Sequence, residues 1–189
     1  MLLRKERGEV ARFGVRLLEA GLTTGTGGNL SVFSRRQGLI AISPSGVEYR
    51  EMKAEHVPLV DCSGVAIDGE CKPSSELGFH LALYRERPDI GAVVHTHSVY
   101  ATTMACLHWE IPAVHYLVGF SGHKVPLAPY ATFGTSELAA AVAGSIGDYN
   151  AVLLANHGLV TVGRDLETAF AVAEEIEAVH DGHHKIEQD

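Results

Sequence analysis

The chain has 189 residues, of which 46% are hydrophobic and 20% are charged, and its formal net charge at pH 7 is −8. This charge argues against a nucleic-acid partner or a membrane surface, and no apolar run is long enough to span a bilayer. The amino-terminal segment MLLRKERGEV has no secretion-type apolar stretch, so we expect a cytoplasmic protein. No linker or repeat divides the chain, which predicts one domain over residues 1–189 with an irregular tail over residues 182–189.

The first half of the chain predicts one helix followed by short strands. Apolar residues recur with helical spacing from residue 3 to residue 20, and Gly21 follows as a natural helix stop. The segment TTGTGGNLSVFSR predicts a loop that leads into a strand, and GLIAISPSG predicts a second strand, antiparallel to the first. Two further short strands are expected in VPLVDCSG and AIDGE.

The second half predicts helices that alternate with strands. In KPSSELGFHLALYRERP, Ser74 or Ser75 can cap a helix that has Glu76 in its first turn and ends before Pro88. The expected elements that follow are a buried strand in GAVVHTH, a short helix in SVYATTMACLH, a strand in IPAVHY, a strand and loop in VPLAPYATFG, a helix in SELAAAVAGSIG, strands in AVLLANHG and LVTVG, and a last helix in DLETAFAVAEEIEAVH.

This order of elements mixes hairpin-like strand pairs with strand–helix alternation. It fits a doubly wound parallel sheet less well than a central sheet that is mostly antiparallel. We therefore predict an α/β fold with α+β-like layering, in which helices flank both faces of that sheet.

Two of the eleven histidines, His95 and His97, stand at the end of GAVVHTH. Side chains alternate across a strand, so both imidazoles are expected on one face and Thr96 on the other. Two neutral imidazoles at this spacing can take adjacent positions on a zinc-class ion, but a usable site needs further ligands from elsewhere in the chain. The pair alone is weak evidence for a metal site.

Two residues elsewhere in the chain can complete such a site. His157, in LLANHGL, also ends a buried apolar strand, and the next glycine permits a sharp exit. Glu76 is the natural carboxylate, because its helix immediately precedes the strand of His95 and a short connection keeps helix and strand adjacent. Packing or solvation explains the remaining histidines better, and the last three belong to the polar tail: His56, His80, His108, His115, His123, His180, His183 and His184.

Three loops offer the small hydroxyls and backbone N–H groups that oxyanion sites use: GTGGN at residues 25–29, SPSG at 43–46 and PSSE at 73–76. Each is weak evidence alone, because Gly and Ser in loops usually form ordinary turns. GTGGN also lacks the spacing of a P-loop or a dinucleotide fingerprint. Their coincidence with the histidine motifs favours a phosphate site beside a metal.

The motifs GTGGNLS, ISPSG, KPSSE, VVHTHS, IPAVHY, PYATFGT and NHGL occur in this order over nearly the whole chain. The set resembles the class II aldolase/adducin family, and within it the aldolases acting on L-fuculose 1-phosphate and on 5-deoxyribulose or 5-methylthioribulose 1-phosphate. The resemblance implies a zinc-dependent enzyme, with Mn²⁺ or Co²⁺ as substitutes, that forms a homotetramer with active sites between subunits.

The resemblance also implies roles for residues in matching motifs. His95, His97 and His157 would bind zinc, and Glu76 would be the acid/base and a fourth ligand in the resting enzyme. Tyr116 would reach a neighbouring subunit's site as proton donor to the aldehyde oxygen, and Phe133 would shape the aldehyde pocket. The phosphate of the sugar would be bound by Gly28, Asn29, Ser45, Gly46, Ser74 and Ser75.

The implied reaction is the reversible cleavage of a ketose 1-phosphate to dihydroxyacetone phosphate and an aldehyde. Zinc held by three neutral histidines keeps its charge and an open position, so it would stabilise the enediolate while Glu76 moves a proton. Phosphate binding remote from the broken bond positions the reacting carbons, which predicts a preference for phosphorylated substrates.

Three other activities are compatible with this resemblance. An L-ribulose-5-phosphate 4-epimerase shares the metal site but typically has Asp in place of Glu76, and a methylthioribulose-1-phosphate dehydratase shares the zinc ligands. An adducin-like, non-catalytic interaction module would not need the histidines and Glu76 that this chain retains. One departure concerns the aldehyde side: family aldolases often carry a tyrosine beyond the last helix, whereas no tyrosine follows Tyr149, so we expect that side to be less closed.

Overall fold

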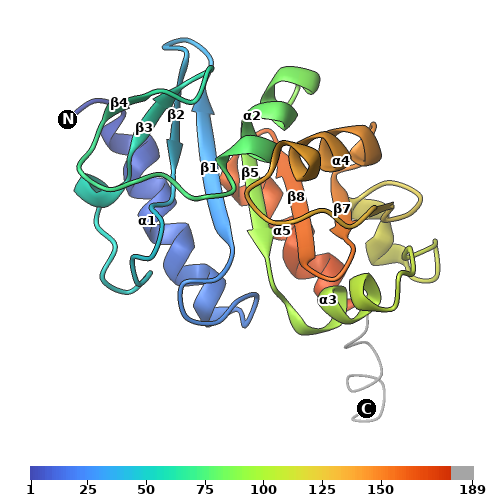
Figure 1. Cartoon of the computed structure of the whole chain (residues 1–189). Coiled ribbons are helices and arrows are strands. Elements are labelled where there is room, and N and C mark those ends of the chain that lie inside the picture. The colour runs from blue at the N-terminus through green and yellow to red at the C-terminus, as the bar shows by residue number, and fades with distance from the viewer. Residues whose placement is uncertain (180–189) are drawn as a thin grey trace.

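The computed structural model describes residues 1–179, which form an eight-stranded sheet between helices (Figure 1). The strands lie in the order β4-β3-β2-β1-β5-β8-β7-β6, and within residues 1–179 every neighbouring pair is antiparallel except β6–β7. This confirms the predicted sheet. The strands are β1 (Asn29–Ser34), β2 (Leu39–Ile42), β3 (Leu59–Asp61), β4 (Ala66–Asp68), β5 (Ala92–Thr96), β6 (Leu127–Ala128), β7 (Ala151–Leu154) and β8 (Gly158–Gly163).

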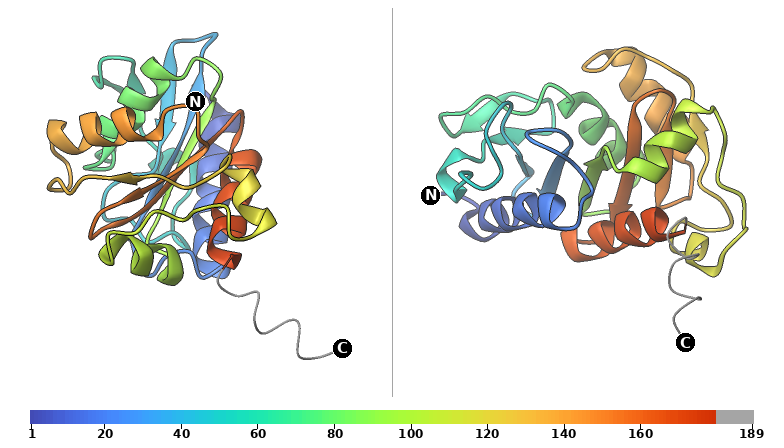
Figure 2. Two further views of the ribbon diagram at one scale, coloured as in Figure 1. Left: turned by 90° about the vertical axis from the view of Figure 1, so that its right-hand side faces the viewer. Right: turned by 90° about the horizontal axis from the view of Figure 1, so that it is seen from below.

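Helices cover both faces of the sheet, as predicted. Helices α1 and α5 lie on one face, and α2 and α4 lie on the other (Figures 1 and 2). Helix α3 packs against β7, β8 and α5 at one end of the sheet. The helices are α1 (Arg4–Glu19), α2 (Leu77–Glu86), α3 (Val99–Cys106), α4 (Ser136–Ile146) and α5 (Leu166–Ala178), with short 3-10 helices η1 (Ala54–His56) and η2 (Tyr116–Phe120).

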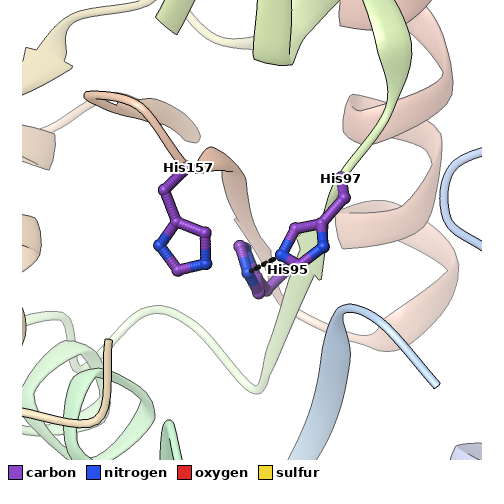
Figure 3. Close-up of side chains that lie close together, drawn as sticks. All are labelled: His95, His97 and His157. Carbon is purple, nitrogen blue, oxygen red and sulfur yellow. Dashed lines mark hydrogen bonds between the residues drawn. The ribbon is translucent and has the colours of Figure 1, made fainter. Parts of the chain in front are cut away.

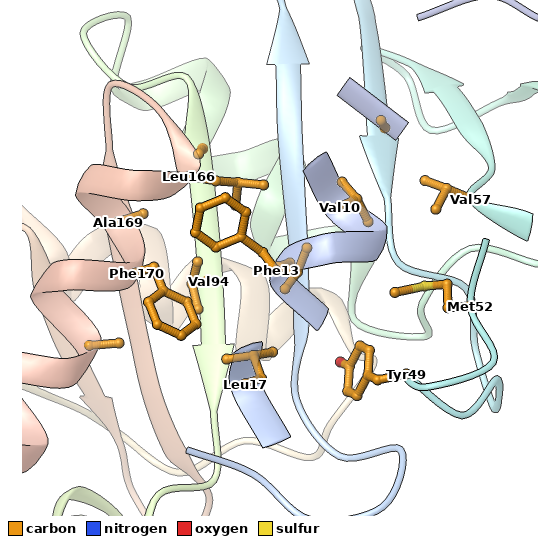
Figure 4. Close-up of a cluster of buried hydrophobic side chains, with 14 of the residues drawn as sticks. Val10, Phe13, Leu17, Tyr49, Met52, Val57, Val94, Leu166, Ala169 and Phe170 are labelled. Carbon is orange, nitrogen blue, oxygen red and sulfur yellow. The ribbon is translucent and has the colours of Figure 1, made fainter. Parts of the chain in front are cut away.

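The central strand β5 is buried along its whole length and divides the core into two layers. Val94 packs with Phe13 of α1 and Phe170 of α5 (Figure 4). Val93 points to the opposite layer, where it packs with Phe79 of α2. Because side chains alternate along a strand, His95 follows Val93 onto the α2 side, and its ring meets Phe79 edge-on at 5.6 Å between centroids.

The start of α2 differs from the prediction. The helix begins at Leu77, so Glu76 occupies the N-cap position and not the first turn. Ser74 Oγ accepts a hydrogen bond from the Glu76 backbone N–H at 3.2 Å, which makes Ser74 the residue that stabilises this turn. The N-cap backbone is not yet helical, and the residue is buried, with 7% of its surface exposed.

The segment IPAVHY, predicted as a strand, does not form one. Ile111 makes an isolated bridge with Val125, and Tyr116 begins η2. Pro112 has no N–H to continue a ladder, which explains why the pairing stops at Ile111.

The tail over residues 182–189, with His183 and His184, lies outside the described residues, as does His180. Within residues 1–179, none of the helices has the length and apolar character needed to cross a membrane.

Candidate metal centre and active site

Three histidines converge at one end of the sheet (Figure 3). His95 comes from β5, His97 lies just beyond the end of that strand, and His157 lies in the turn between β7 and β8. One ring nitrogen of each lies within 4.8 Å of the others, and the Nε2 atoms of His95 and His97 are 3.0 Å apart. The prediction that His95 and His97 face the same way is confirmed.

The glycine after His157 allows this convergence. Strand β8 pairs with β5 in the register His95↔Val160 and Thr96↔Leu159. A Cβ on Gly158 would lie 2.3 Å from the carbonyl oxygen of Thr96, so only glycine lets the β7–β8 turn approach β5 this closely.

The three imidazoles are prepared to bind a cation. Nδ1 of His95 donates to the carbonyl oxygen of Leu159 at 2.9 Å, which leaves its Nε2 lone pair directed at the other rings. Burial lowers the pKa of His95 well below its ordinary value and also lowers the pKa of His97. Burial lowers the pKa of His157 as well, although the charge of Glu76 acts in the opposite direction. Neutral imidazoles are the form that coordinates metals.

Glu76 lies against the same cluster. Its Oε2 is 3.3 Å from His95 Nε2, and its Oε1 is 3.5 Å from His157 Nε2. Burial raises the pKa of Glu76, while His157 and the hydrogen bond from Asn29 lower it. Oε1 is buried and has no hydrogen-bond partner among the described residues.

This donor set fits a divalent cation. Three neutral imidazole nitrogens and one carboxylate oxygen are typical ligands of a zinc-class ion. A cation would also satisfy the buried Oε1, which otherwise carries the cost of an unpaired polar atom.

The structure brings the three predicted phosphate loops to the same end of the sheet. Ser45 N donates to Lys72 O at 2.9 Å and Ser74 N donates to Ser43 O at 3.1 Å, which joins the second loop to the third. The first loop approaches β5 even more closely, because a Cβ on Gly28, whose φ is +68°, would lie 2.5 Å from the carbonyl oxygen of His95. Ser45 and Gly46 are exposed, as Ser75 is, so their polar groups are accessible to a ligand.

Glu76 and two of the histidines open into a cavity of about 410 Å³. Phe133 lines this cavity, whereas Tyr116 is 81% exposed and is not among its lining residues. The complete lining is Ser75, Glu76, His97, Tyr130, Ala131, Phe133, Asn156 and His157.

Comparison with known proteins identifies the family. Residues 8–181 match the family described as class II aldolase and adducin N-terminal domain. The chain belongs to this family. This confirms the resemblance drawn from the motifs and the expectation of an aldehyde-lyase of the aldolase type. Class II aldolases are metal-dependent, which agrees with the histidine cluster.

Relatives of this class II aldolase match it over most of its length. The 5-deoxy-D-ribulose 1-phosphate aldolase of Bacillus thuringiensis serovar kurstaki is 56% identical over 177 residues, covering 94% of this chain and 83% of the relative. The L-fuculose phosphate aldolase of Haemophilus influenzae is 43% identical over 164 residues, covering 86% and 74%. A solved L-fuculose 1-phosphate aldolase matches with a TM-score of 0.91 at 41% identity, covering 97% of this chain and 88% of that one.

Sequence reasoning missed several residues of the class II aldolase site. Tyr130 and Asn156 line the cavity, and both stand inside motifs that the sequence already singled out, PYATFGT and ANHG. His80, which the sequence assigns to packing or solvation, is completely buried and hydrogen-bonded to Asn29. No local signal marks His80, because its polar partners come from β1.

Proposed function

We propose that this chain is a zinc-dependent class II aldolase that reversibly cleaves a ketose 1-phosphate of the L-fuculose or 5-deoxyribulose type to dihydroxyacetone phosphate and an aldehyde. One observation carries the proposal: ring nitrogens of His95, His97 and His157 meet beside Glu76, at the wall of a cavity that Ser75 of the third loop also lines. The relatives named for 5-deoxyribulose 1-phosphate and fuculose phosphate support this substrate class.

The metal would be held by His95, His97 and His157, with Glu76 as a fourth ligand before substrate arrives. When bound, the cation supplies a Lewis acid that offsets negative charge developing on the three-carbon fragment. Zinc is preferred over Mn²⁺ or Co²⁺ because the site is rich in imidazole, and both alternatives would fit as substitutes.

Glu76 would move the proton in this reaction. Cleavage breaks the C3–C4 bond: the C4 hydroxyl loses its proton as the aldehyde forms, and the electron pair passes to C3. That carbon must then gain a proton to give dihydroxyacetone phosphate. The carboxylate lies at the cavity wall with one oxygen held by Asn29 and the other without a hydrogen-bond partner among residues 1–179, so it can hold and deliver a proton at C3.

The phosphate would bind in the three loops, through Gly28, Asn29, Ser45, Gly46, Ser74 and Ser75. Asn29 Nδ2 donates one hydrogen bond to Glu76, and its second N–H remains free to donate to the phosphate. Backbone N–H groups of small residues approach an anion closely. Phe133, which lines the cavity, would contact the aldehyde fragment.

Tyr116 would act in a neighbouring subunit of a homotetramer, as proton donor to the aldehyde oxygen in condensation; in cleavage the same group would take up the proton that the C4 hydroxyl loses. Its side chain is 81% exposed and is absent from the lining of its own cavity. Trp109 and Val114, in the same stretch of chain, are 60% and 68% exposed. Large apolar side chains gathered in one exposed segment are typical of a subunit interface, which supports contact between copies here.

A cleavage assay with metal-replete enzyme tests the proposed function. The substrates are fuculose 1-phosphate, 5-deoxyribulose 1-phosphate, methylthioribulose 1-phosphate and ribulose 5-phosphate, and the readouts are released dihydroxyacetone phosphate and, by NMR of the reaction mixture, any epimerised or dehydrated product. We expect release from at least one 1-phosphate. Epimerisation of ribulose 5-phosphate alone, or dehydration of methylthioribulose 1-phosphate without release, would instead assign one of the related activities, and no reaction at all would contradict the proposal.

A further inference from the structure

A chain of buried hydrogen bonds runs away from the cavity behind Glu76. Asn29 Nδ2 contacts Glu76 Oε2 at 2.8 Å, and Asn29 Oδ1 contacts His80 Nε2 at 2.6 Å. His80 Nδ1 contacts Ser31 Oγ at 2.7 Å, and Ser31 Oγ contacts the Tyr84 hydroxyl at 2.7 Å. Each of these five residues is at most 7% exposed, and His80 and Ser31 are fully buried.

We propose that His80 is a positioning residue: it fixes the amide of Asn29 so that this amide donates to Glu76 and holds the carboxylate in its working orientation. The inference deepens the proposed function and rests on it, since it takes Glu76 as the proton-transferring group. His80 does not line the cavity, so it acts through Asn29 and does not touch substrate.

The polarity of the chain follows from what each group can donate. An ionised carboxylate only accepts, so Asn29 must present its NH₂ to Glu76 and its oxygen to His80. His80 must then carry its proton on Nε2, and its Nδ1 must accept from the Ser31 hydroxyl. The Tyr84 hydroxyl donates toward Ser31, where the backbone carbonyl oxygen accepts at 3.0 Å and Oγ lies at 2.7 Å. One tautomer of His80 is thus selected from the Glu76 end, and the Ser31 hydroxyl, which can donate or accept, complies with it.

The location of His80 explains how this arrangement is held in place. It lies one helical turn after Glu76, so both side chains project from the same side of α2. The Phe79 ring stacks on the His80 ring at 4.7 Å and 19°, and α2 lies over the β1–β5 part of the sheet (Figure 1). The imidazole satisfies two buried polar atoms, Asn29 Oδ1 and Ser31 Oγ, which an apolar side chain of the same size would leave without this partner, so packing alone does not account for a histidine here.

Pinning one oxygen of Glu76 also directs the other. Because Oε2 accepts a hydrogen bond from Asn29, Oε1 points toward His157. In that position Oε1 could bind a metal or exchange a proton with the substrate. If the Asn29 amide turned over, its oxygen would face the carboxylate and repel it. His80 prevents this by donating to Oδ1, a role that neither Ser31 nor Tyr84 can perform from their positions.

Two variants of matched length test the proposal in the metal-replete full chain. His80→Gln places an amide N–H near the position of Nε2, whereas His80→Met has no donor. We expect His80→Met to lower kcat by about 10- to 100-fold, with KM and metal content close to wild type, and His80→Gln to keep most of the kcat. A wild-type kcat in His80→Met, or equal losses in both variants, would overturn the inference.

Two further measurements separate positioning from simple structural damage. Ser31→Ala is a small change that removes the donor to His80 Nδ1, and it should also lower kcat while metal content stays unchanged. This variant replaces His80→Met in the test if His80→Met fails to fold. In a Glu76→Gln background, His80→Met should add no further loss, because its effect runs through Glu76. If the two substitutions lowered kcat independently, so that the double variant lost the product of both factors, His80 would not act through Glu76.

A readout without turnover distinguishes failure of this inference from failure of the proposed function. Nitrogen-15 NMR of histidine-labelled protein should show His80 protonated on Nε2 and unprotonated on Nδ1. The opposite tautomer would overturn the inference even in an active enzyme. If the wild type cleaves no ketose 1-phosphate but shows the expected tautomer, the proposed reaction fails while the hydrogen-bond polarity stands.

Discussion

Glu76 Oε2 lies 3.3 Å from Nε2 of His95, at the point where the N-cap of α2 meets the end of β5. Both groups are buried, and their short separation would let them bind the same cation. The two residues are held in place in different ways, however. His95 is fixed by the β5–β8 ladder, whereas Glu76 is held by side chains, so the first is suited to a constant ligand and the second to a group that moves a proton.

His97→Ala should remove metal and activity together. His97 supplies one of three ring nitrogens that lie within 4.8 Å of one another, and its loss leaves two imidazoles and the Glu76 carboxylate, one ligand fewer than the four proposed for the resting site. Metal analysis of protein expressed with added zinc should give about one ion per wild-type chain and less than about 0.2 in the variant. His56→Ala, in η1, is the control and should retain metal. A fully loaded His97→Ala protein would remove this residue from the ligand set.

Glu76→Gln should separate metal binding from catalysis. Three histidines remain to hold the ion, but the amide cannot accept and return a proton, so kcat should fall by at least about 100-fold. Glu86→Gln, an exposed position in the same helix, is the matched control. Metal content and kcat are measured on the same preparations, and substantial turnover by Glu76→Gln would exclude it as the acid/base.

The metal ligands could be predicted from sequence because their signal is local. His95 and His97 stand two residues apart on a strand, and His157 precedes a glycine at the end of another apolar run. The alternation of strand side chains then settles which way the first pair faces. The order of strands and helices was enough to predict a mostly antiparallel sheet with helices on both faces.

The hydrogen bonds behind Glu76 could not be predicted in this way. His80 meets Asn29 and Ser31 only because β1 pairs with β5 in the register Asn29↔His95 and Ser31↔Val93, with α2 packed over them. A change of register by one residue would turn both polar side chains of β1 to the other face. The contacts of His80 with Asn29 and Ser31 therefore depend on tertiary packing, and the spacing of residues in the sequence does not predict them.

Gly158→Ala should destabilise the fold and disturb the metal site. The new Cβ would lie 2.3 Å from Thr96 O, so the β7–β8 turn must shift, and His157 would shift with it. We expect the free energy of unfolding in urea to fall by about 1–3 kcal/mol, as for other overpacked sites, with weaker metal binding.

Gly144→Ala is the control for that substitution. Gly144 lies in α4, and a Cβ there meets no atom within 4 Å. Alanine in an exposed helix should stabilise by about 0.5–1 kcal/mol. Equal effects of the two substitutions would show that close approach at Gly158 does not matter.

His80 should make stability depend on pH in a defined window. Burial lowers the pKa of His80 from its ordinary 6.5 to about 3. Between these values the unfolded chain binds a proton that the folded chain does not, so stability is fully present above pH 6.5 and is lost as the pH falls. The slope is about 1.4 kcal/mol per pH unit.

His80→Gln isolates this contribution, because glutamine does not titrate and the other buried histidines remain. With metal removed by a chelator and at one protein concentration, the free energy of unfolding in urea is compared at pH 7.5 and pH 5.0. The wild type should lose about 2 kcal/mol more than His80→Gln over this interval. Burial of His95 lowers its pKa in both proteins and cancels in the comparison. An equal loss in both would mean that His80 is protonated in the folded protein, and a charged imidazole could not accept the Ser31 hydroxyl proton at Nδ1.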